Sequence, residues 1–119
     1  MSYIDGFVVP VPRTQIDAYR KMAQDCADIW REHGALRVCE CIADDVKPGK
    51  LTSFPQAVDL QEDEIVVFSW IEYASRASRD EVNDKVMNDP RMTAMMKPEN
   101  TPFDGKRMIY GGFDVLLER

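Results

Sequence analysis

The sequence has no surplus of basic residues, and this shortage excludes one class of partner. Of its 119 residues, 15 are Lys or Arg and 21 are Asp or Glu, which gives a net charge of −6. Proteins that bind nucleic acid neutralise phosphates with clustered basic side chains. We therefore expect no nucleic-acid partner.

Long apolar runs are also missing. None reaches the roughly 18–20 residues of a membrane span. The first residues, Met1 to Gly6, lack the charged leader and apolar stretch of a signal peptide. We expect a cytoplasmic protein with no membrane partner.

Cysteine and histidine are scarce. The cysteines are Cys26, Cys39 and Cys41, and His33 is the only histidine. Cys39 and Cys41 lie two residues apart on a predicted strand, so their Cα atoms would be roughly 6.5–7 Å apart, at or past the limit for a disulfide. We predict reduced thiols. A metal site made of Cys39, Cys41 and His33 would lack a fourth ligand, so we expect no metal and no cofactor.

The hydrophobic patterns that are present alternate between strand and helix periods. Four apolar runs predict strands, and two segments with helical spacing predict helices. The strands are expected at 3–11, 36–43, 65–73 and about 107–115, and the helices at 14–33 and from Ser75 or Ser78 to Pro90. Thr14 is the expected cap of the first helix and Gly34 its end. The segment 44–56 is predicted to be a loop.

This order, β-α-β-β-α-β, predicts a ferredoxin-like α+β fold with one domain over residues 1–119. Both helices should cover one face of a four-stranded antiparallel sheet. The strands are apolar on both faces, and a monomer would leave a large apolar surface bare. We therefore predict a homodimer that packs sheet against sheet as a dimeric α/β barrel.

Several motifs resemble the YbaA-like bacterial proteins, a family of domains of unknown function. They are Phe68–Tyr73, Ser78-Arg79-Asp80, Asp89–Met92 and Phe103–Phe113, and the likeness extends over nearly the whole chain. The resemblance implies the dimeric α/β barrel fold and implies no reaction. Other barrels of this class include cofactor-free monooxygenases and isomerases, which is an analogy of fold alone.

Two strand carboxylates and one histidine are the candidates for chemistry. Glu40 and Glu72 lie among apolar neighbours, where a carboxylate must be paired or protonated. Arg37 and Arg107 could pair with them, which would make these groups structural ion pairs. His33 could move a proton, although at a helix end it could simply stabilise the helix dipole.

Aromatic residues on the strands are the candidates for binding. Trp70 and Tyr110 combine an apolar ring with a polar atom, and with Glu40 and Arg107 they form the predicted ligand-binding set. Plain core packing is the alternative. The pair Gly111-Gly112 inside the last strand predicts a close approach by a helix, a second subunit or a ligand. Asp5 and Asp114 are expected in solvent at strand ends.

Three functions follow from these features. The first is a homodimer that either does no catalysis or binds a small hydrophobic or acidic metabolite. The second is a cofactor-independent enzyme acting on a small aromatic or lactone substrate, with Trp70 and Tyr110 holding the ring and Glu72 or His33 moving a proton. The third is nucleic-acid binding, which the charge disfavours.

Overall fold

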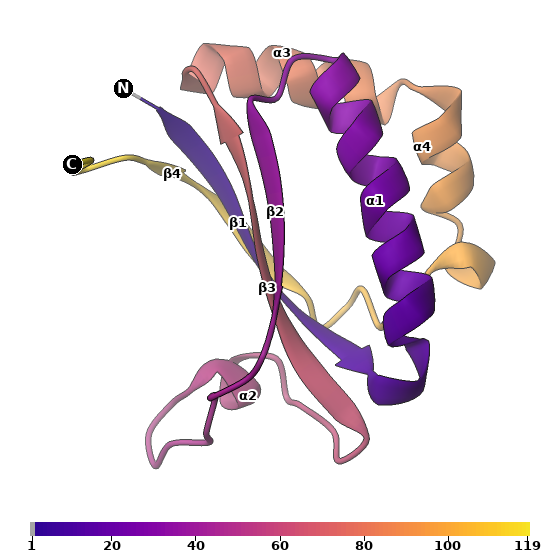
Figure 1. Ribbon diagram of the computed structural model, residues 1–119, viewed down its shortest axis with the longest axis vertical. Coiled ribbons are helices and arrows are strands. Elements are labelled where there is room, and N and C mark those ends of the chain that lie inside the picture. Colours follow the sequence, from indigo (N-terminus) through magenta and orange to yellow (C-terminus); the bar gives the residue numbers. More distant parts are fainter. Residues whose placement is uncertain (1) are drawn as a thin grey trace.

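The computed structural model describes residues 2–119 and has the predicted order of elements (Figure 1). The strands are β1 (Tyr3–Pro12), β2 (Arg37–Ile42), β3 (Glu64–Tyr73) and β4 (Ile109–Asp114). The helices are α1 (Ile16–Glu32), α2 (Phe54–Ala57), α3 (Arg76–Met87) and α4 (Pro90–Met95), with 3-10 turns η1 (Arg13–Gln15) and η2 (Pro98–Asn100). The predicted α+β, ferredoxin-like fold is confirmed.

The four strands form one antiparallel sheet in the order β2-β3-β1-β4. The register pairs Tyr3 of β1 with Tyr73 of β3 and with Asp114 of β4, and it pairs Arg37 of β2 with Glu72 of β3. The most apolar runs, β1 and β3, therefore occupy the centre of the sheet, as predicted for β3. The shorter strands β2 and β4 are its two edges.

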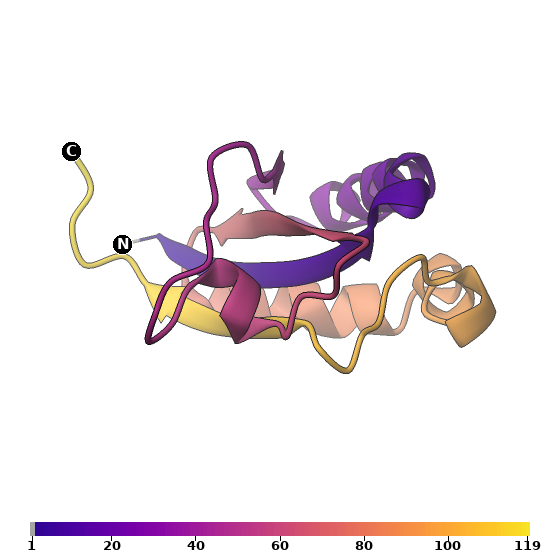
Figure 2. The ribbon, with the colours of Figure 1, turned by 90° about the horizontal axis from the view of Figure 1, so that it is seen from below.

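Helices α1, α3 and α4 all lie on one side of the sheet (Figures 1 and 2). Because side chains alternate along a strand, odd-numbered residues of β1 and β3 face these helices. The main core lies in this layer, where Ile71 and Tyr73 of the sheet meet Ile29 and Val86 of the helices. Next to it, Val9 packs with Tyr19 and Ala23 of α1. We call this side of the sheet the helix face and the opposite side the open face.

The local signals at helix ends were partly right. Ser75 caps α3, since its hydroxyl accepts a hydrogen bond from the Ser78 amide at 3.0 Å. Gly34 ends α1 with φ +120°, a backbone conformation that favours glycine. Thr14 was wrong as a cap, because a 3-10 turn covers residues 13–15 and α1 begins at Ile16 without a side-chain cap.

The predicted loop 44–56 contains the start of the short helix α2, which the sequence reading missed. Ser53 caps it by accepting a hydrogen bond from the Gln56 amide at 3.3 Å, and Pro55 occupies its first turn. The segment folds back over one end of the open face, where Val58 and Leu60 pack on Val8 and Val66.

Side chains of the same chain occupy the space beside the two glycines of β4, Gly111 and Gly112. An added Cβ on Gly112 would overlap the ring of Tyr3 on the helix face, and one on Gly111 would contact the Phe113 ring at 3.7 Å. The same ring lies 3.7 Å from the Cβ position of Gly6. The close approach predicted for this strand thus comes from the rings of Tyr3 and Phe113, which lie directly over the glycines where a larger side chain would not fit.

Candidate functional site

The open face carries apolar side chains that the helices do not cover. Phe68 is 42% exposed and Phe113 62% exposed, and Ile109 is also exposed. The C-terminal residues Leu116 and Leu117 are exposed as well, on a tail that extends away from the body (Figure 2). A bare apolar surface of this kind is typical of an interaction site.

Trp70 and Glu72 lie together on this open face, near the β2 edge. The Trp70 indole donates a hydrogen bond to Glu72 Oε2 at 3.2 Å, and Arg37 Nε lies 3.6 Å from the same oxygen. Phe68 contacts Trp70, with ring centroids 5.8 Å apart. Glu72 is therefore half-buried, and its carboxylate is held by Trp70 and Arg37 of the same chain. The sequence had named Arg37 as a possible partner.

Cys39 and Cys41 lie opposite these aromatic residues on β2. Their sulfur atoms are 4.0 Å apart and both thiols are free. His33 lies elsewhere, and residues 2–119 contain no group of three or more His, Cys, Asp or Glu side chains with the arrangement of a metal site.

A groove with a volume of about 530 Å³ lies on the helix face, between α1 and the edge strand β2. Its walls are mostly apolar and include Ile16, Val38, Ile42 and Val67. The α1 residues that face it include Ala23 and Ala27, whose small side chains leave the space open. An apolar groove with a few polar groups is the usual form of a small-molecule site.

Glu40 and Tyr19 supply the polar centre of this groove. The Tyr19 hydroxyl donates a hydrogen bond of 2.7 Å to Glu40 Oε1. Tyr19 is buried, whereas Glu40 as a whole residue is exposed because β2 is an edge strand. The Glu40 side chain lines the groove, where desolvation raises its pKa and the Tyr19 hydrogen bond offsets only part of this rise.

Burial also raises the pKa of the two other titratable groups beside Glu40. Desolvation raises the pKa of Tyr19, and the charge of Glu40 adds to that effect. Desolvation likewise raises the pKa of Cys26, about two turns further along α1, to about 11. Both groups are therefore neutral at physiological pH.

The predicted binding residues do not form one pocket within the chain. Tyr110 pairs with Phe7 and stacks on its ring on the helix face, with centroids 6.1 Å apart. Trp70 projects from the opposite face, so these two rings cannot hold one ligand between them in a single chain. Glu40 is on the same face as Tyr110 but at the far edge of the sheet.

Arg107 forms ion pairs with two carboxylates of its own chain. Its guanidinium makes paired contacts of 2.7 and 2.6 Å with the buried carboxylate of Glu64 and a further contact of 3.0 Å with Asp104. The hydrogen bonds from Arg107 lower the pKa of Glu64, and Glu64 in turn raises the pKa of Arg107. Arg107 thus joins the segment before β4 to the start of β3.

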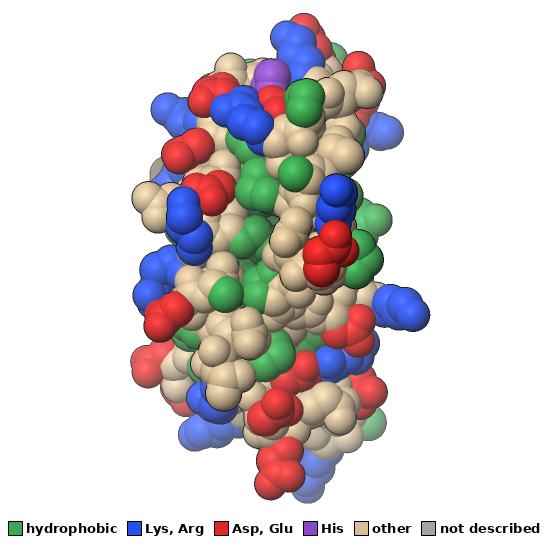
Figure 3. Space-filling model, turned by 90° about the vertical axis from the view of Figure 1, so that its right-hand side faces the viewer, with side chains coloured by type: hydrophobic (Ala, Val, Ile, Leu, Met, Phe, Trp, Pro, Cys, Tyr) green, Lys and Arg blue, Asp and Glu red, His purple; other side chains and the backbone are tan. Residues whose placement is uncertain are grey.

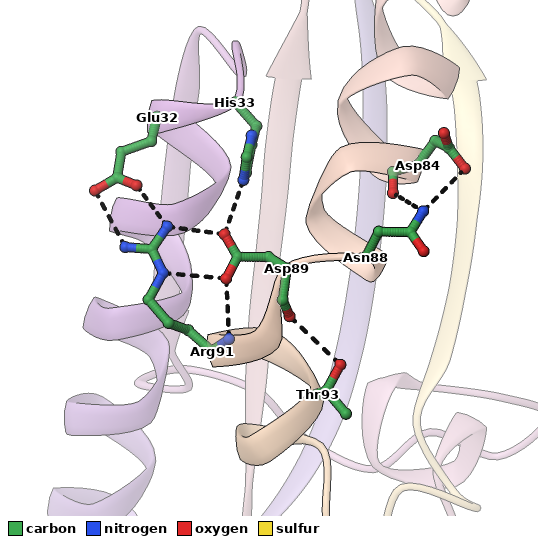
Figure 4. A network of polar contacts seen from close by, with 7 residues as sticks. All are labelled: Glu32, His33, Asp84, Asn88, Asp89, Arg91 and Thr93. Carbon is green, nitrogen blue, oxygen red and sulfur yellow. Dashed lines mark hydrogen bonds and ion pairs between the residues drawn. The ribbon is translucent and has the colours of Figure 1, made fainter.

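His33 belongs to a network that links α1 to α4 (Figure 4). Its Nε2 lies 2.9 Å from Oδ2 of Asp89, a buried residue that caps α4 by accepting the Arg91 amide. Arg91 bonds Asp89 and Glu32 at 2.8 and 2.6 Å. The bonds from Arg91 and His33 hold the pKa of Asp89 well below its usual range.

A second hollow, about 360 Å³, lies between α1 and α4 beside this network. Figure 3 shows this side of the molecule, where apolar side chains form a narrow band between charged flanks. Its lining includes Ile29 and Met95 together with Asp25, Asp28, Glu32 and Arg91. This apolar band lies where α1 packs against α4. Arg91 beside it is paired with Asp89 and Glu32.

The expectation for Asp5 was wrong. Asp5 is buried on the helix face and pairs with Arg79 of α3 at 2.8 Å, whereas Asp114 is exposed. The Arg79 guanidinium also lies 4.9 Å from the centre of the Tyr3 ring. The alternation of β1 places Asp5 between the core residues Tyr3 and Phe7, and that pattern was the available signal.

Comparison with known proteins gives the family. The model of a family described as "Protein of unknown function (DUF1428)" matches residues 2–105. The chain belongs to this family. It is 55% identical over 118 residues to the uncharacterized protein YbaA of Escherichia coli K12, covering 99% of each chain, and equally similar to YbaA of Shigella flexneri. The resemblance seen in the sequence is thus confirmed.

Solved structures agree on the fold. The chain resembles an uncharacterized NIPSNAP domain protein from Burkholderia xenovorans with a TM-score of 0.61 and 16% identity, over 95% of this chain and 93% of that one. It also resembles a dimeric ferredoxin-like protein from an uncultured marine organism, with a TM-score of 0.53 and 15% identity over the full length of both chains. Within residues 2–119, no helix combines the length and apolar character needed to cross a bilayer.

Proposed function

We propose that this protein is a homodimer that binds a small molecule in the groove between α1 and β2. The observation that carries the ligand proposal is the Glu40–Tyr19 pair, because it places a partly desolvated carboxylate in a mostly apolar groove. Carboxylates whose pKa is raised by desolvation in a groove are often found at functional sites. Glu40 was one of the residues that the sequence predicted for binding.

The open face supports the proposal of a homodimer. It presents aromatic side chains around Phe68 and Phe113, and among residues 2–119 no further strand pairs with the sheet edges β2 and β4. A second copy has the same apolar face, so two copies related by a twofold axis would cover each other. A related fold is dimeric in the marine ferredoxin-like protein.

Sedimentation velocity at micromolar concentration tests the dimer. We expect the wild type to sediment as a dimer and Phe68→Lys to sediment as a monomer with an unchanged circular dichroism spectrum. Asp84→Lys is the matched control, because Asp84 is exposed on α3, on the other side of the sheet from the open face, and should not affect assembly. A monomeric wild type would contradict the proposal.

Native mass spectrometry of protein purified from its host tests the ligand. We expect the dimer to carry a reproducible extra mass that denaturation releases. Glu40→Gln keeps the shape of the side chain and removes its charge, so the variant should remain dimeric and lose this mass. An empty wild-type dimer from several growth conditions would count against the groove as a ligand site.

A further inference from the structure

Glu40 differs from the other inward-facing carboxylates in what balances its charge. Three carboxylates that the chain buries have an arginine partner: Asp5 has Arg79 at 2.8 Å, Glu64 has Arg107 at 2.6 Å and Asp89 has Arg91 at 2.8 Å. Glu40 makes no ion pair with any cation among residues 2–119, and its bonded partner there is the neutral Tyr19. Its charge is thus uncompensated by the chain.

The lining of the groove offers no replacement. Arg20 is the one cation among the lining residues, and its guanidinium lies 3.2 Å from Asp17 on the outer surface of α1. The titratable groups of α1 beside Glu40 are Tyr19 and Cys26, and burial raises the pKa of each. Both are neutral near pH 7, so neither supplies a positive charge to Glu40.

We propose that the groove binds a small apolar molecule that carries a protonated amine, with Glu40 as its counter-ion. This inference rests on the proposed function and names the ligand class of the same site. A cation next to a desolvated carboxylate offsets the cost of burying that charge, and charge-assisted hydrogen bonds are the strong ones. The net charge of −6 also favours the approach of a cation over that of an acid.

The geometry favours an ammonium over a guanidinium. A guanidinium binds best to both oxygens of a carboxylate at once. Tyr19 already occupies Oε1 of Glu40, which leaves Oε2 as the free acceptor. One free oxygen suits the compact, single-point charge of an ammonium group, while the apolar walls around Ile16, Val38 and Ile42 suit a hydrocarbon or aromatic body.

Calorimetric titration with three related probes tests the charge. The probes are 2-phenylethylamine, 2-phenylethanol and phenylacetate, which share a ring and a two-carbon frame and differ in charge. We expect the amine to bind about tenfold or more tightly than the alcohol, from the usual strength of a hydrogen bond to a charged group, and phenylacetate to bind more weakly than both. Glu40→Gln should abolish the preference for the amine, whereas Glu62→Gln, on the exposed loop before β3, should preserve it.

A second variant tests the location separately from the charge. Ala27→Leu adds bulk to the groove wall without changing its charge, so it should weaken all three probes alike. Equal binding of the amine and the alcohol, or an amine preference that survives Glu40→Gln, would overturn the amine inference while leaving the groove as a ligand site. If none of the probes binds, the amine inference fails, and an empty native dimer would then show separately that the proposed function fails.

Discussion

The buried ion pair between Asp5 and Arg79 allows the most demanding test of the packing described above. Arg79→Ala would remove the 2.8 Å contact with Asp5, the bond to the Tyr3 hydroxyl and the contact with the Tyr3 ring. The side chains of Asp5 and Arg79 are 11% and 18% exposed, so water would compensate the stranded carboxylate poorly. Breaking a buried pair from one side costs about 3–5 kcal/mol.

For a domain of this size each kcal/mol lowers the melting temperature by about 4 °C, so Arg79→Ala should melt roughly 12–20 °C below the wild type. Urea unfolding, followed by circular dichroism at one fixed protomer concentration, gives the free energy directly. Lys85→Ala is the matched control on the same helix, since Lys85 and Glu81 form an exposed pair at 3.2 Å that should contribute less than about 1 kcal/mol.

The double variant Asp5→Ala with Arg79→Ala removes the stranded charge along with its partner. We expect it to be more stable than Arg79→Ala alone, because no unpaired carboxylate is left in the core. If Arg79→Ala costs no more than Lys85→Ala, the pair contributes nothing to the core and the account of this face of the sheet is wrong.

Three further predictions concern stability. Gly112→Ala should lower the free energy of unfolding by about 1–3 kcal/mol through overlap with the buried Tyr3, whereas Gly105→Ala, with open space around the added Cβ, should leave the urea midpoint within error of wild type. The lowered pKa of Asp89 contributes stability that is complete above its unfolded value of 3.8 and is lost as the pH falls below that value. Asp89→Asn should therefore reduce the fall in melting temperature at acid pH, and an unchanged fall would refute the assignment. The raised pKa of Glu40 acts in the opposite direction, since its favourable contribution to stability is present below the unfolded value of 4.5 and is lost at higher pH. Glu40→Gln should therefore be at least as stable as wild type at pH 7. Lower stability of this variant at pH 7 would show that the carboxylate is structural.

The fold could be predicted because the hydrophobic periods are strong and local. The run Ile65–Tyr73 is apolar on both faces, which predicted the central position that β3 occupies. Gly34 and Pro90 marked the ends of α1 and α3 through backbone restrictions that hold in any context. Helix α2 was missed because its four residues, Phe54–Ala57, are too few to show a period.

The pairing of charged residues could not be predicted in the same way. Arg79 lies 74 residues from Asp5, and Arg107 lies 43 residues from Glu64, so their meetings depend on how α3 and the segment before β4 pack on the sheet. Alternation along β1 and β2 does assign Asp5 and Glu40 to the helix face. This alternation does not tell which of the two carboxylates has an arginine partner. Asp5 has one and is part of a structural ion pair, whereas Glu40 has none and is a candidate for ligand binding.

The most direct test of the account is to map where a ligand binds by amide NMR, titrating the ¹⁵N-labelled protein with 2-phenylethylamine and with the neutral 2-phenylethanol. The account predicts that the amides shifted by either probe cluster in residues 16–27 of α1 and 38–42 of β2, which line the groove. Shifts confined to the open face around Phe68 and Phe113, or no shifts with either probe at millimolar concentration, would contradict the claim that this groove is the binding site.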